Sequence, residues 1–153
     1  MKLELENIFV RGAIAGSISA AVICMFMEIF ELLGLAKKCW LFMAGQPVMQ
    51  FTHTLWQSVF AFLVHLGVGA FWGVIIALLF SFIFTTRYYL FKGPVMGISI
   101  FFLHVGLLSK VLGYPPQLRE DLVSLFLIFL TYIIYGGLAA TLIVKLPWKE
   151  AVS

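Results

Sequence analysis

Four long apolar runs, separated by short polar stretches, occupy nearly the whole chain of 153 residues. Of all residues, 63% are hydrophobic and 11% are charged, and the mean hydropathy is +1.08. In a typical soluble domain, roughly half of the residues are apolar and about a quarter are charged. A helix of about 20 apolar residues crosses the hydrocarbon core of a bilayer. The sequence therefore predicts a small polytopic α-helical membrane protein.

We expect an all-α fold with four transmembrane helices in an up-down-up-down bundle, forming a single domain over residues 1–153. The connection after the first helix is apolar but is interrupted at Gly45 and Pro47, and it is too short to span the membrane. An interfacial helical segment is predicted there, with a short re-entrant element as the alternative. The predicted helices cover residues of about 9–35, 58–84, 92–112 and 121–146.

Small residues mark the helix faces that we expect to pack together. Gly12 and Gly16 recur at a spacing of four in the first helix, and Gly69 and Gly73 do so in the second. In lipid, close approach of backbones contributes much of the packing between helices, and small residues permit it. His65 shares the glycine face of the second helix because it precedes Gly69 by one helical turn.

Ionisable side chains inside the predicted spans are the candidate functional residues, because they are costly to place in lipid. At a rise of about 1.5 Å per residue, three of them fall at similar depths on three different helices. Our hypothesis is that Glu28, His65 and His104 form one buried polar cluster that binds a metal ion or carries protons. The complete candidate set is Glu28, Glu31, His65 and His104.

Each of these side chains also has a structural interpretation. A buried histidine commonly hydrogen-bonds a backbone carbonyl or a hydroxyl of a neighbouring helix, and Glu31 lies near the membrane boundary, where water or a lysine can satisfy it.

The metal stays unassigned and no cofactor is expected, since no spacing of the His-Glu-x-x-His type occurs. The absence of a Gly-x-Ser-x-Gly motif or another nucleophile–base pair favours a protein that is not an enzyme.

A polar segment at residues 112–121 is the second candidate region. Its prolines break the third helix, and its carboxylates fall in the first turns of the last helix, where the helix dipole favours them. The functional interpretation is a binding surface on the outer face, and the structural one is a tight turn followed by a helix start. The residues of this candidate surface are His53, Tyr114, Arg119, Glu120 and Asp121.

The net charge of +3 comes from basic residues scattered at helix ends, so no nucleic-acid partner is expected. One side of the membrane receives Lys2, Arg11, Arg87, Lys92, Lys145 and Lys149. The other side receives Lys37, Lys38, Lys110 and Arg119. The excess of basic residues on the first side favours two cytoplasmic termini. The expected partners are the lipid bilayer and either a second copy of the chain or another membrane protein.

Several short features together resemble a known family. They are the Gly12–Gly16 stretch, the Lys92–Gly97 opening of the third helix, the proline-containing third loop, and the Leu130–Gly137 stretch. In these features the chain resembles the small four-helix membrane proteins of Gram-positive bacteria of the YqhR type. The resemblance covers most of the chain and implies the bacterial inner (plasma) membrane and four helices. It implies no activity, and it does not extend to Glu28 and Glu31.

The function expected from the sequence is that of a non-enzymatic accessory or structural partner in the membrane, which self-associates through its glycine faces. The alternative is a subunit of a small oligomeric transporter or channel, in which Glu28, His65 and His104 line a path. A membrane enzyme that acts on lipid is a third and less supported reading.

Overall fold

The computed structural model of the chain describes residues 2–37, 44–45, 54–108, 111 and 121–145. Within these residues it contains four helices long and apolar enough to cross a membrane, and no β-strand. The helices are α1 (Lys2–Leu32), α3 (Leu55–Phe82), α4 (Tyr89–Phe101) with its continuation as the π-helix η1 (Phe102–Leu108), and α7 (Leu122–Lys145). The predicted all-α, four-helix membrane fold is therefore confirmed, whereas the predicted interfacial segment lies almost entirely outside the described residues.

Local interactions explain where the helices begin and end. The Thr54 side chain accepts a hydrogen bond from the backbone N–H of Gln57, and the Gln57 side-chain oxygen accepts one from the backbone N–H of Thr54, so α3 begins earlier than predicted. The chain leaves α1 at Gly34, whose φ of +71° suits a residue without a Cβ. Between α3 and α4, the Lys92 ammonium donates to the carbonyl of Thr85 at 2.8 Å and closes the turn.

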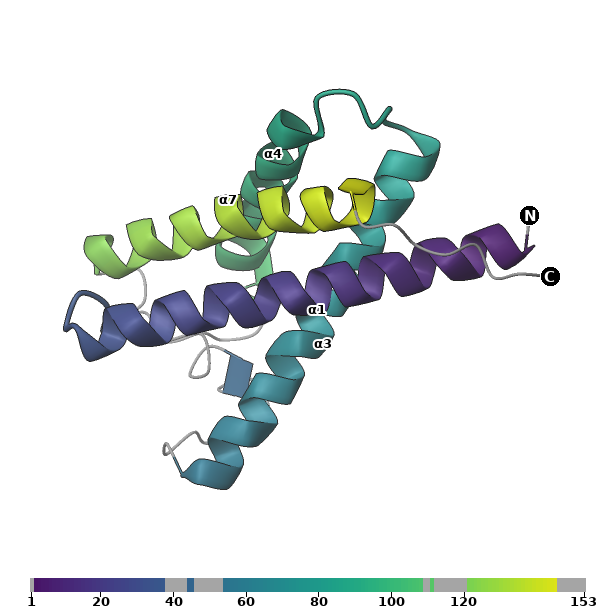
Figure 1. Cartoon of the computed structure of the whole chain (residues 1–153). Coiled ribbons are helices and arrows are strands. Elements are labelled where there is room, and N and C mark those ends of the chain that lie inside the picture. The colour runs from purple at the N-terminus through teal and green to yellow at the C-terminus, as the bar shows by residue number, and fades with distance from the viewer. Residues whose placement is uncertain (1, 38–43, 46–53, 109–110, 112–120, 146–153) are drawn as a thin grey trace.

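The helices form two crossed pairs. α1 packs on α3, α4 packs on α7, and α1 and α7 lie side by side in opposite directions, whereas α3 and α4 hardly touch one another. Consecutive helices alternate in direction as an up-down-up-down bundle requires, but α3 and α4 cross the α1–α7 pair steeply (Figure 1). The four helices therefore meet around one central region and diverge towards their ends.

Glycines form the first crossing, as the small-residue rows predicted. A Cβ placed on Gly16 would come within 3 Å of the Cα of Gly73 and the carbonyl carbon of Gly69, so only glycine permits this approach of α1 to α3. These glycines are therefore engaged in helix packing within the chain.

Glycines form the second crossing as well. A Cβ placed on Gly97 would come within 3 Å of the Tyr132 carbonyl, and one placed on Gly136 would come within 3 Å of the Gly97 Cα. The α4–α7 pair is thus held at the same close range as the α1–α3 pair. The two crossings fix the positions of the helices within each pair, and the packing of α1 against α7 joins the two pairs.

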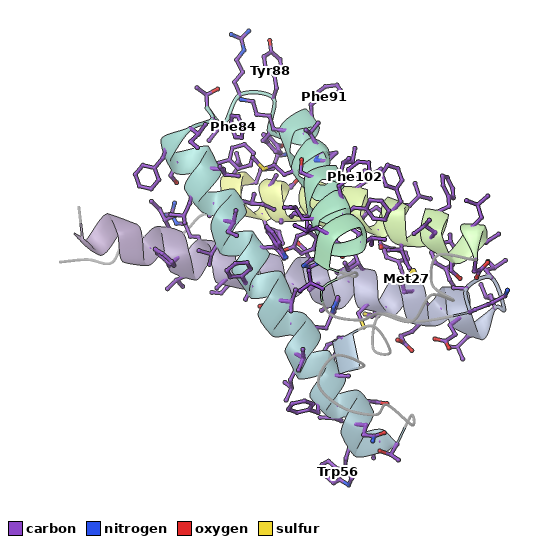
Figure 2. The ribbon with its side chains drawn as sticks, turned by 180° about the vertical axis from the view of Figure 1, so that it is seen from behind. Met27, Trp56, Phe84, Tyr88, Phe91 and Phe102 are labelled. Carbon is purple, nitrogen blue, oxygen red and sulfur yellow. The ribbon has the colours of Figure 1, made fainter. Side chains whose placement is uncertain are left out.

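The side chains are distributed as expected for a protein in lipid. The interior is filled by apolar residues such as Met27, which is fully buried, while large apolar and aromatic side chains cover the outside (Figure 2). Trp56 at the start of α3 and Tyr88 before α4 are exposed at opposite ends of the molecule (Figure 2). Trp and Tyr are enriched at the two membrane–water interfaces, a preference that the positions of these two residues match.

Candidate functional site

His65 is held by the backbone of α1 at the first crossing. It lies on the glycine row of α3, is only 7% exposed, and its Nε2 is 3.1 Å from the carbonyl oxygen of Ala20. Because a carbonyl only accepts hydrogen bonds, Nε2 carries the proton and donates it. This is the interhelical contact that the structural interpretation of this histidine predicted.

His104 links three helices through both of its ring nitrogens. The indole N–H of Trp72 on α3 donates to His104 Nε2 at 2.9 Å, and His104 Nδ1 lies 2.6 Å from the hydroxyl oxygen of Tyr132 on α7. An indole N–H can only donate, so Nε2 is the unprotonated nitrogen and Nδ1 donates to Tyr132. The network therefore selects one neutral tautomer of His104.

The backbone around His104 departs from a regular α-helix. The segment Phe102–Leu108 is a π-helix, a conformation that is rare and frequently occurs at functional sites. It continues α4 directly. Because its hydrogen bonds join residues five apart and not four, its turns are wider than those of an α-helix, and different side chains face the bundle. His104 faces Trp72 and Tyr132 from this segment, with its ring edge-on to both rings.

The two histidines line one small cavity at the centre of the bundle. The cavity has a volume of about 30 Å³, and its wall also contains Trp72, Tyr132 and Tyr135. The Tyr135 hydroxyl donates to the Gly69 carbonyl at 2.6 Å, which ties α7 to α3 beside the cavity. A space of this size has room for one or two water molecules but not for a larger ligand. Two of the three residues of the predicted cluster thus converge on this cavity.

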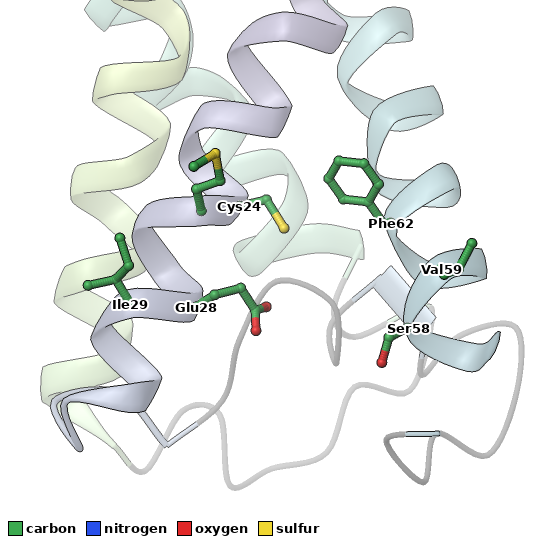
Figure 3. Close-up of a pocket in the computed structure, with 7 residues that line it drawn as sticks. Cys24, Glu28, Ile29, Ser58, Val59 and Phe62 are labelled. Carbon is green, nitrogen blue, oxygen red and sulfur yellow. The ribbon is translucent and has the colours of Figure 1, made fainter. Parts of the chain in front are cut away.

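Glu28 does not join the two histidines. It lines an open groove of about 480 Å³ between the last turns of α1 and the first turns of α3. Figure 3 shows the Glu28 carboxylate extending from α1 into the space between the helices, into which Phe62 projects from α3. The residues that line this groove, called here the α1–α3 groove, include Cys24, Met25 and Glu28 of α1 and Ser58, Val59 and Phe62 of α3.

The crossing angle explains why the groove and the cavity are separate. α1 and α3 touch around Gly16 and Gly69 and diverge beyond Ala20. Glu28 lies eight residues past Ala20, a rise of about 12 Å along α1. His65 therefore lies at the level of Ala20, about 12 Å along α1 from Glu28, and the two residues do not share the depth that the sequence predicted. Within the described residues, no group of three or more His, Cys, Asp or Glu side chains is arranged to hold a metal ion.

One carboxylate oxygen of Glu28 is in an unusual position. Its Oε1 atom is buried, yet no described residue provides it with a hydrogen bond or an ion pair. Neighbours in the groove are the apolar side chains of Met25, Val59 and Phe62 together with the thiol of Cys24. A polar group buried without a partner is costly, and native structures contain few of them.

The remaining predicted site residues have ordinary positions or lie outside the described part of the chain. Glu31 is half-buried near the end of α1. The Asp121 carboxylate accepts a hydrogen bond from the Ser124 hydroxyl at the start of α7, and Ser124 Oγ accepts one from the backbone N–H of Lys37 at 2.9 Å. Asp121 therefore organises the start of a helix, as its structural interpretation predicted. His53, Tyr114, Arg119 and Glu120 lie outside the described residues.

Sequence reasoning did not single out Trp72, Tyr132 or Tyr135 as site residues. Aromatic residues are common in membrane helices, so their polar atoms carry little signal by themselves. The signal that was available is that Tyr132 and Tyr135 lie three residues apart beside Gly136, on a face expected to be buried. A buried tyrosine hydroxyl usually needs a hydrogen-bond partner, which points to a polar group on a neighbouring helix.

The sequence matches no protein-family model and no curated protein, and no solved structure matches it.

Proposed function

We propose that the protein is a non-enzymatic membrane protein that binds another component of the membrane through the α1–α3 groove. In this proposal it is an accessory partner in a bacterial inner membrane, with both termini in the cytoplasm. The resemblance to the YqhR type supports the bacterial inner membrane, and the larger number of basic residues on the side of the termini supports the orientation.

The observation that carries the proposal is the groove itself. Its volume of about 480 Å³ lies within the range of small-molecule sites, roughly 300–1,000 Å³. The glycine crossings hold α1 and α3 together at their centres and leave their adjoining ends apart, so the groove is a consequence of the fold. Apart from the Glu28 carboxylate, the Ser58 hydroxyl and the Cys24 thiol, the described lining of the groove is apolar, which suits a component that is already dissolved in the bilayer.

Photocrosslinking in native membranes tests this proposal. A photoreactive residue in place of Val59 lies in the groove, and one in place of Val95, which is exposed on α4, serves as the matched control. We expect a discrete adduct at position 59 that is missing at position 95, and mass spectrometry identifies it as lipid, small molecule or protein. The same set of bulk-lipid adducts at both positions would overturn the proposal.

A second candidate function is a subunit of a small oligomeric transporter or channel. The observation in its favour is that two ionisable side chains, His65 and His104, line one water-sized cavity inside the bundle. Proton flux into proteoliposomes measures this directly. A flux that His104→Phe abolishes would support the candidate, and a flux equal to that of empty liposomes would rule it out.

A further inference from the structure

We propose that the α1–α3 groove binds a hydrophobic organic cation, with Glu28 as its counter-ion. This inference rests on the proposed function, because it names the chemical class of the component that the groove takes. It follows from the charge, the shape and the depth of the groove.

The charge argument starts from Glu28. Its buried Oε1 has no hydrogen-bond or ion-pair partner among the described residues. A carboxylate in apolar surroundings is stabilised by an opposite charge, and ionisable groups in membrane spans mark ligand or ion sites more often than chance. A bound cation supplies the missing partner.

The composition of the groove distinguishes an organic cation from a metal ion. Mg²⁺ and Ca²⁺ require several oxygen ligands, and around Glu28 the described part of the groove presents a thiol, one serine hydroxyl and apolar side chains. An alkyl- or aryl-substituted ammonium or phosphonium ion needs no such set, because its substituents shield the charge and bury apolar area. Met25, Val59 and Phe62 provide that apolar area.

Phe62 adds a second favourable feature. It projects into the space between the helices from α3, while Glu28 extends into the same space from α1 (Figure 3). The face of an aromatic ring attracts a cation, and this attraction increases when the cation is desolvated. A cation in the groove therefore has a negative charge on one wall and an aromatic ring on the other.

The depth of the groove favours an amphiphile that arrives from the bilayer. Glu28 lies four residues before the end of α1 at Leu32, a rise of about 6 Å, and Ser58 lies in the first turn of α3. The groove is thus near one end of both spans, close to the level of the lipid headgroups. A hydrophobic cation concentrates at that level, with its charge towards the headgroups and its body in the hydrocarbon.

Two ions of matched shape and opposite charge test the inference on the full-length protein in a non-ionic detergent. The probes are tetraphenylphosphonium and tetraphenylborate, and equilibrium dialysis measures the binding of each. We expect saturable binding of tetraphenylphosphonium and none of tetraphenylborate. Glu28→Gln keeps the shape of the side chain and removes its charge, so it should weaken binding of the cation by about tenfold or more, which corresponds to about 1.4 kcal/mol.

Glu31→Gln is the matched control, since Glu31 lies one turn further along α1 and does not line the groove. This variant should bind the cation within about twofold of the wild type, a difference of about 0.4 kcal/mol. Ser58→Trp provides a second variant that retains Glu28 and fills the groove from α3, and it should abolish binding. Equal binding by the wild type and Glu28→Gln, or equal binding of the two ions, would overturn the inference.

The outcomes also separate this inference from the proposed function. A discrete crosslink at position 59 without binding of tetraphenylphosphonium would reject the cation and retain the groove as a binding surface. Binding of the cation that depends on Glu28 would support both. Failure of both experiments would reject both.

Discussion

Tyr135 of α7 donates its hydroxyl to the backbone carbonyl of Gly69 on α3, at 2.6 Å. Gly69 is also one of the glycines at which α1 crosses α3, and Tyr135 precedes Gly136, at which α7 crosses α4. This hydrogen bond therefore connects the two crossed pairs at their centres. It passes beside the cavity that His65 and His104 line.

Replacing Tyr135 by Phe removes this connection and leaves the ring in place. Hydrogen bonds between membrane helices contribute about 0.6 kcal/mol on average and up to about 1.7 kcal/mol. We expect a loss near the upper value, because the Gly69 carbonyl is buried and water does not replace the hydroxyl. Unfolding in mixed micelles measures the change in the free energy of unfolding. Tyr89→Phe, at a half-buried tyrosine of α4, is the control and should change it by less than about 0.5 kcal/mol.

Gly16→Ala should strongly destabilise the fold. The added methyl group would meet the backbone of Gly69 and Gly73, and a backbone cannot move aside as a flexible side chain can. Overpacking typically costs 1–3 kcal/mol. We expect the free energy of unfolding to fall by at least about 3 kcal/mol, because the atoms that the methyl group would meet belong to the backbone of both glycines.

Gly67→Ala is the matched control for this prediction. Gly67 lies on the same helix as Gly69, but a Cβ added there meets nothing within 4 Å. Alanine has a higher helix propensity than glycine by about 1 kcal/mol, so this variant should be neutral or more stable. If both variants changed the free energy of unfolding equally, the crossing would not depend on close approach at Gly16.

Much of this fold could be predicted from the sequence because lipid imposes simple rules. A long apolar run must be a helix, since the bilayer offers no partner for unpaired backbone groups. The spacing of Gly12 and Gly16, and of Gly69 and Gly73, identified the faces that pack. The sequence of a single helix does not encode which face of a neighbouring helix it contacts, or the angle at which the two helices cross.

The candidate site was predicted less well than the fold, because it depends on how the helices cross. The depth of a residue in the membrane can be estimated from its position along a helix. This estimate placed Glu28, His65 and His104 at a similar depth. In the structure, His65 instead contacts Ala20, eight residues before Glu28 on α1. Beyond that contact α1 and α3 diverge, which opens the α1–α3 groove at Glu28. His104 reached the centre, but its partners Trp72 and Tyr132 come from helices whose rotation a single sequence does not fix.

The tautomer of His104 is open to direct measurement. Because Trp72 donates to Nε2, the ¹⁵N NMR spectrum of the histidines should show an unprotonated Nε2 and a protonated Nδ1 for His104. Trp72→Phe removes the donor that selects this form, and the spectrum should then show a mixture of both neutral tautomers. A protonated Nε2 in the wild type would contradict the network.

Glu28→Leu should make the protein more stable in the absence of a ligand. The buried Oε1 of Glu28 has no described partner, and removal of such a group recovers a cost of about 1–3 kcal/mol. Leucine also matches the apolar walls of the α1–α3 groove. Natural proteins often keep a destabilising residue at a site where function requires it, so a gain in stability together with loss of cation binding would identify Glu28 as such a residue.

The free energy of unfolding of Glu28→Leu, compared with that of Glu31→Leu, measures this effect. Glu31 is half-buried near the end of α1, and its replacement should change the free energy by less than about 0.5 kcal/mol. A loss of stability in Glu28→Leu would mean that the carboxylate supports the fold through an interaction of its own. The charge of the groove would then be a structural feature and not the counter-ion of a cationic ligand.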